Sequence, residues 1–261
     1  SDNLTYSLNM VSIKNGIISN NGVVVELTKE ENFETNPIQV SKIVSTDVGN
    51  VGYLMYNQFV ATKSNDLNKI FAEFKTNGII DLVIDLRYNG GGSVRNCVEL
   101  ASMITGQLTG EVFSNELWNS KLDAYFLEKY GSDSQKNRFV NVLSDGEPIN
   151  SLELNRVFIL TTSESASASE LLINGLAPLI EVIHIGEQTV GKNVGSITVY
   201  DYIDNDGTRN PDHRYAMQPI VLKIANSEGF ADYADGLEPS RLIEEDLQNM
   251  GALGDKNEPF L

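Results

Sequence analysis

Cysteine and histidine are nearly absent from this chain of 261 residues. Cys97 is the only cysteine and there are two histidines, so the sequence can form neither an internal disulfide nor a zinc site built from cysteine and histidine. Long apolar runs are also missing, since none approaches the ~18 residues that a membrane-spanning helix needs. These absences exclude disulfide scaffolds, zinc modules and helical membrane proteins. The redox compartment stays open, because oxidising compartments also tolerate cysteine-poor proteins.

Positive charge is scarce as well. The chain has 19 Lys and Arg against 36 Asp and Glu, which gives a formal net charge of −17 and a pI near 4.4. Such a surface repels phosphate backbones and anionic membranes, so neither DNA nor any other nucleic acid is expected as a partner. The chain starts at Ser1 without a basic and apolar leader, and we therefore expect that any export signal or membrane anchor has been removed from this sequence.

The first part of the chain has the pattern of short strands. Residues 6–13 and 22–27 are separated by Asn-Gly turn signals, and a polar connector over residues 29–37 precedes renewed strand character from residue 38. We therefore expect a small β extension, or the remnant of a preceding domain, over residues 1–37. Residues 38–261 are then expected to form the main core.

Buried-strand and helical patterns alternate in the middle of the chain. Residues 52–56 and 79–86 are typical of buried strands, and apolar residues at helical spacing lie between them, at Leu67, Ile70, Phe71 and Phe74. This βαβ pattern predicts an α/β core. The aromatic residues between positions 118 and 130 are spaced as on one or two helices, and residues 180–185, 197–203 and 215–224 are predicted strands.

A serine cluster follows another buried-strand pattern. Residues 156–161 are apolar and end directly in this cluster, after which helical spacing continues until Pro178. Ser167 is thus predicted at the start of a helix, where unpaired N–H groups and the helix dipole favour developing negative charge. The alternative is a purely structural capping box formed by Ser167 and Glu170.

Two loops offer chemistry that would complement Ser167. Lys192 ends the segment 186–192, and a lysine can deprotonate a serine only where burial keeps its amine neutral; Val190 and Val194 make such desolvation plausible. The alternative is an ordinary surface lysine. The glycine triplet 90–92 follows a predicted strand and could present bare N–H groups. It lacks the G-K-[ST] and G-x-G-x-x-G patterns, which argues against a phosphate site.

Four segments in the same order resemble the tail-specific, or C-terminal processing, serine peptidases, in particular their cell-envelope members in Bacteroidetes-type bacteria. These segments are Gly-Tyr-Leu at 52–54, Asp-Leu-Arg-Tyr-Asn-Gly-Gly-Gly at 85–92, Ser-Ala-Ser-Ala-Ser-Glu at 165–170 and Gly-Glu-Gln-Thr-Val-Gly-Lys at 186–192. The resemblance implies a crotonase-like α/β core that hydrolyses polypeptides, at unstructured or C-terminal segments, without metal or cofactor. It also implies a cell-envelope location, periplasmic or lipoprotein-anchored.

The resemblance assigns individual roles. Ser167 corresponds to the nucleophile and Lys192 to the base, and the oxyanion donors are the N–H of Ala168 and that of Gly90 or Gly91. Ser-Lys pairs are known variants of the catalytic triad. Ser196 stands where family members often carry a glutamine that orients the lysine, so Ser196 is predicted to take that role.

Several features depart from the family pattern. Pro178 replaces an aspartate found in some members, and no complete PDZ domain fits before the core. A peptide is nevertheless expected to add as a strand along an edge near residues 215–224.

The rival hypotheses are a binding module without turnover and, on the same fold, an acyl-CoA hydratase, for which the acidic chain lacks a basic patch. His184 is predicted to be a core residue, and residues 204–207 an acidic turn rather than a calcium loop.

Overall fold

The computed structural model describes residues 4–246 and 248–261. The chain is of mixed α/β type, as predicted, and its described part contains the α-helices α1 (Ser64–Thr76), α2 (Val94–Thr105), α3 (Ser120–Tyr130) and α4 (Ala168–Leu176). Within that part, no helix is both long enough and apolar enough to cross a bilayer.

The larger sheet has six strands in the order β14-β9-β8-β5-β4-β3. Neighbouring strands run parallel except for β3 and β4, which are antiparallel. The central strands are apolar and β5 is buried throughout its length, as expected for strands covered on both faces. The strand bounds are β3 (Ile38–Thr46), β4 (Gly49–Tyr56), β5 (Asp81–Asp85), β8 (Arg156–Thr161), β9 (Glu181–Gly186) and β14 (Arg241–Leu242).

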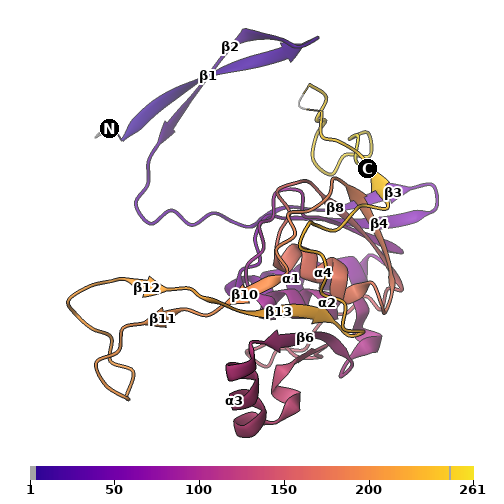
Figure 1. The fold of residues 1–261 in the computed structure, drawn as a ribbon. Coiled ribbons are helices and arrows are strands. Elements are labelled where there is room, and N and C mark those ends of the chain that lie inside the picture. The colour runs from indigo at the N-terminus through magenta and orange to yellow at the C-terminus, as the bar shows by residue number, and fades with distance from the viewer. Residues whose placement is uncertain (1–3, 247) are drawn as a thin grey trace.

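A second, antiparallel sheet lies on the other side of the helices. Its strands are ordered β10 (Val194–Ser196), β13 (Ile220–Asn226), β6 (Val112–Trp118) and β7 (Lys136–Arg138). Helices α1, α2 and α4 lie between the two sheets, and α3 lies beyond the second one (Figure 1). The main apolar core fills this middle layer and includes Leu67 of α1, Leu100 of α2 and Leu172 of α4.

The parallel register brings two of the sequence motifs together. Strands β5 and β8 are neighbours, with Asp85 opposite Leu160. Their carboxyl ends therefore meet at the same edge of the sheet, where parallel α/β folds form their ligand sites. The glycine turn follows β5 and the serine cluster follows β8, so both loops lie at this edge.

The N-terminal segment forms a separate hairpin of β1 (Thr5–Lys14) and β2 (Ile17–Thr28), which stands away from the two sheets (Figure 1). It turns at Asn15 and Gly16, both of which have positive φ. The second Asn-Gly signal lies inside β2 instead of separating two strands, beside an irregularity in the pairing near Asn9 and Val11. The division of the chain at residue 37 stays a prediction.

Two regions differ from the sequence prediction. Trp118 ends strand β6 and is not helical, whereas Tyr125, Phe126 and Tyr130 lie on α3 as predicted. The strands predicted over residues 197–203 and 215–224 are broken into a short hairpin, β11 (Val199–Tyr200) with β12 (Ala216–Met217), and the longer strand β13. Because β13 pairs with β10 on one side and β6 on the other, the edge predicted there for peptide addition is not free over β13.

His184 is a packed core residue, as predicted. It lies on β9 with 4% of its surface exposed, and its Nε2 is 2.6 Å from Oγ1 of Thr161, which in turn donates to the carbonyl of Glu187. Burial lowers the pKa of His184 to about 4. The imidazole is therefore neutral in the folded protein at neutral pH.

This burial predicts a loss of stability in mild acid. The unfolded chain protonates His184 near its ordinary pKa of about 6.5, and the folded chain resists protonation until about pH 4. Between these values the unfolded state binds more protons, so the free energy of unfolding falls by roughly 3 kcal/mol as the pH falls from 7 to 4. Urea unfolding of the wild type and of His184→Asn between pH 7 and 4 should give a shallower fall for the variant; parallel falls would contradict the prediction.

Candidate active site

Ser167 occupies a strained elbow between β8 and α4. Its backbone has φ +59° and ψ −109°, a region that non-glycine residues rarely adopt and that costs about 1–3 kcal/mol. The caps of α2 and α3 are ordinary: Ser93 before α2 has φ −71° and ψ 119°, and Asn119 before α3 has φ −61° and ψ 154°. Ser167 therefore begins its helix in a conformation that capping alone does not require. Such strain is typical of a nucleophile held at a strand-to-helix turn.

A single buried carboxylate joins the elbow to the lysine loop. Glu170 is fully buried, and its Oε2 accepts from the N–H of Ser167 at 2.7 Å and from that of Lys192 at 2.9 Å. Its Oε1 accepts from Oγ1 of Thr189 and from the N–H of Gly191, both at 2.6 Å. The backbone nitrogens of Ser167 and Lys192 thus share one oxygen atom. The capping partner proposed from the sequence is present, but it serves both motifs.

The glycine turn lies directly against the elbow. A Cβ added at Gly91 would lie 2.6 Å from Cβ of Ser167 and 2.8 Å from the nitrogen of Ala168. The carbonyl of Asn89 accepts from the N–H of Ala166 at 3.1 Å and from Oγ of Ser169 at 2.8 Å. The two loops therefore meet at the residues that the sequence selected.

The donors predicted for an oxyanion differ in availability. Ala168 is the first residue of α4, so its N–H has no carbonyl partner within the helix. The N–H of Gly91 donates to Oδ1 of Asn89 at 2.8 Å. That of Gly90 has no protein partner in the part of the chain that the structure describes. Ala168 and Gly90 are thus the freer pair of donors, and Gly91 provides the close contact between the loops.

Lys192 is exposed. The neighbouring Val190 is exposed too, with 49% of its surface accessible to solvent. The expectation that valine neighbours desolvate the lysine was therefore wrong for the chain by itself, because the loop packs through Glu170 and Thr189 rather than through its valines.

Ser196 is also exposed and ends strand β10, opposite Ile220. Within the described residues no hydrogen bond joins it to Lys192, and its orienting role stays a prediction. A Ser196→Ala variant with unchanged kcat would remove that role.

Sequence reasoning missed two supporting residues. Asn89 holds the glycine turn, since its side chain donates to the carbonyl of Tyr56 at 2.8 Å and accepts from Gly91. Arg87 is buried under the same turn, with salt bridges of 2.7 Å to Asp85 and 2.6 Å to Glu258. The available signal in the sequence was a charged residue and an amide residue directly after an apolar run that is typical of a buried strand. Such groups are buried only with partners.

The described residues contain no group of three or more histidine, cysteine, aspartate or glutamate side chains arranged to hold a metal ion. The acidic loop near residue 204 is a turn held by hydrogen bonds within the loop. Oδ1 of Asp204 accepts from the N–H groups of Asp206 and Thr208 at 3.0 and 2.9 Å. The side chain of Thr208 and these backbone contacts lower the pKa of Asp204. The chemistry that the site offers is that of a serine hydroxyl, a lysine amine and backbone donors.

Comparison with known proteins agrees with this geometry. A model of peptidase family S41 matches residues 50–217. The chain is 26% identical over 190 residues to the carboxyl-terminal-processing protease of Picosynechococcus sp., covering 73% of this chain and 39% of that protein. It is 24% identical over 183 residues to carboxyl-terminal-processing peptidase 1 of Arabidopsis thaliana, covering 70% of this chain and 33% of that one. The chain thus spans well under half the length of these relatives.

Solved structures share the fold. A Bacteroides fragilis protein assigned to the S41 proteases superposes with a TM-score of 0.78 at 24% identity, covering 99% of this chain and 65% of that one. The photosystem II D1 C-terminal processing protease superposes with a TM-score of 0.58 at 19% identity, covering 85% and 52%.

Proposed function

The chain belongs to peptidase family S41, and we propose that it hydrolyses peptide bonds through an acyl-enzyme on Ser167, with Lys192 as the base. The observation that carries this proposal is the carboxylate of Glu170, whose Oε2 accepts from the N–H groups of both residues. A structural cap has no reason to bind the lysine loop as well. The strained backbone of Ser167 supports the same assignment.

The proposed reaction follows the logic of acyl transfer. The neutral amine of Lys192 takes the proton of Ser167 as Oγ attacks the scissile carbonyl carbon, and returns it to the leaving amine. The N–H groups of Ala168 and of Gly90 or Gly91 stabilise the negative oxygen of the tetrahedral intermediate. Water then hydrolyses the acyl-enzyme by the same steps. Bound peptide excludes water from Lys192, which the free chain leaves exposed.

Several finer features belong to this proposal. We expect a crotonase-like core over residues 38–261, an N-terminal β extension or domain remnant before it, and a cell-envelope location. The substrates are unstructured or C-terminal segments of polypeptides, as in C-terminal processing peptidases.

A second candidate is a peptide-binding module without turnover. The exposure of Lys192 and the lack of a hydrogen bond between it and Ser196 in the described chain favour this candidate. The two functions differ in whether Ser167 is activated in solution.

A fluorophosphonate probe that reacts only with activated serines separates them. At pH 8 to 9 we expect labelling of Ser167 in the wild type, none in Ser167→Ala, and labelling slowed by ~10²-fold or more in Lys192→Ala, the usual share of a general base. Lys69→Ala is the matched control, because Lys69 is an exposed lysine on α1. Rates are measured by mass spectrometry of the intact protein and the labelled peptide.

A wild type that stays unlabelled would favour the binding module. Labelling that is equally fast in Lys192→Ala would refute the role of the lysine, and labelling at another serine of the cluster would refute the assignment of Ser167.

A further inference from the structure

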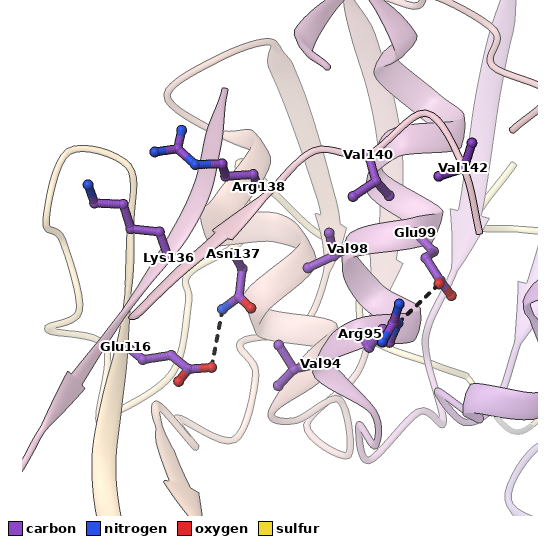
Figure 2. A pocket seen from close by; sticks show the side chains of 10 residues that line it. All are labelled: Val94, Arg95, Val98, Glu99, Glu116, Lys136, Asn137, Arg138, Val140 and Val142. Carbon is purple, nitrogen blue, oxygen red and sulfur yellow. Dashed lines mark hydrogen bonds and ion pairs between the residues drawn. The ribbon is translucent and has the colours of Figure 1, made fainter. Parts of the chain in front are cut away.

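A pocket of about 440 Å³ lies between helix α2 and strands β6 and β7. Figure 2 shows Glu116 and Asn137 pointing from the strands toward the valines of α2. The lining combines short branched apolar side chains with two carboxylates, one amide and three basic side chains. Its apolar residues are Val94, Val98, Val140 and Val142, and Glu116 and Asn137 are among its polar residues.

The pocket lies close to the glycine turn beside Ser167 and to the loop that carries Lys192. Val94 is three residues from Gly91, which touches Ser167, so their Cα atoms are at most ~11 Å apart. On the other side, Glu116 is paired with Ile224 across the sheet, and the N–H of Ile224 donates to the carbonyl of Asn193, next to Lys192. Two strand spacings place Glu116 about 10 Å from that carbonyl.

Glu116 is a partly buried acid without a cation. Its Oε2 accepts from Nε1 of Trp118 at 3.1 Å and its Oε1 from Nδ2 of Asn137 at 3.4 Å, both neutral donors. No lysine or arginine among the described residues forms a salt bridge with it. Burial raises the pKa of Glu116, which is the mark of a carboxylate whose charge lacks compensation.

The cations around the pocket are engaged elsewhere. Arg95 also lines the pocket and is paired with Glu99 at 3.5 Å. Lys136 and Arg138 point away from the valines (Figure 2), and both pair with Asp133, at 3.6 and 2.6 Å. Glu116 is therefore the one charged residue of the pocket lining without a salt bridge among the described residues. A guest of opposite charge would supply its partner.

We propose that this pocket is a subsite for a lysine or arginine side chain of the peptide substrate, with the methylene stem along the valines and the cationic head at Glu116. Aliphatic stems of this kind bury against apolar walls while their heads reach a polar group. An extended peptide rises about 3.3 Å per residue, so the side chain belongs to a residue about three positions from the scissile bond. This inference rests on the proposed function.

The test separates binding from turnover. A peptide of fixed sequence carries lysine, norleucine or glutamate three residues before or after the scissile bond; norleucine keeps the apolar stem and lacks the charge. Affinity is measured by fluorescence anisotropy on Ser167→Ala at pH 8, and kcat/KM on the wild type. For one of the two positions we expect lysine to exceed norleucine by about tenfold and glutamate to be the weakest.

Glu116→Gln should remove the advantage of lysine over norleucine and leave the norleucine peptide unchanged. Glu128→Gln is the matched control, because Glu128 is an exposed glutamate on α3 outside the pocket, and it should keep the wild-type preference. Equal binding and cleavage of lysine and norleucine peptides at both positions would overturn the subsite and leave the peptidase assignment standing. A lysine preference in binding without any cleavage would support the subsite and refute the peptidase.

Discussion

Replacing Glu170 by glutamine is expected to lower kcat by ~10²-fold or more, with a smaller change in KM. The carboxylate accepts four hydrogen bonds, two at each oxygen, from Ser167, Thr189, Gly191 and Lys192. An amide has one acceptor oxygen, so its NH2 group must face two donors. A displacement of about 1 Å between nucleophile and base is enough for a loss of this size.

The same substitution should also destabilise the fold. Two buried donors lose their acceptor in Glu170→Gln, and each unsatisfied buried group costs about 1–3 kcal/mol. We therefore expect the free energy of unfolding to fall by roughly 2–6 kcal/mol, measured by urea unfolding at pH 7. The kinetic effect is measured on protein kept well below its unfolding midpoint.

Two further variants test whether kcat falls because the nucleophile and base are displaced or because the fold is less stable. Thr189→Val removes one of the four contacts and should give an intermediate loss of kcat, whereas Glu164→Gln, at an exposed glutamate of the same loop, should have no effect. A folded Glu170→Gln enzyme with wild-type kcat would show that the shared carboxylate does not position the pair.

The parts of the fold that follow from local patterns could be predicted from the sequence. The apolar run that forms β8 and the helical spacing of α1, which ends at Thr76 before Asn77 and Gly78, specify their own conformation. Strand β13 could not be predicted in the same way. The sequence pattern gives one strand over residues 215–224, which in the structure is divided between β12 and β13. Its bounds depend on pairing with β6 and β10, which are distant in sequence.

In the candidate site, too, some features follow from local sequence patterns and others depend on contacts between distant segments. The positions of Ser167 and of the glycine turn follow from local strand and helix patterns. The role of Glu170 does not, since three of its four donors lie about 20 residues further along the chain and only the fold brings them near. The exposure of Lys192 likewise depends on what packs against its loop, and valine neighbours in sequence do not determine this.

Gly91→Ala is expected to lower kcat/KM by ~10²-fold or more and to destabilise the protein by roughly 2–5 kcal/mol. The new Cβ would lie 2.6 Å from Cβ of Ser167 and 2.8 Å from the carbonyl oxygen of Ala166, so the glycine turn or the elbow must move. The φ of +99° adds strain of about 1–2 kcal/mol for any L-residue. The displaced atoms are those that hold the nucleophile and the Ala168 donor.

Two other glycines separate the causes of this loss. Gly110 also has positive φ, +89°, but a Cβ there would meet nothing within 4 Å, so Gly110→Ala should show the cost of strain alone and keep its activity. Gly90 has open space and no positive φ, and Gly90→Ala should change the free energy of unfolding by less than either. If Gly91→Ala were no less stable and no less active than Gly110→Ala, the close contact between the glycine turn and Ser167 would not be required for catalysis.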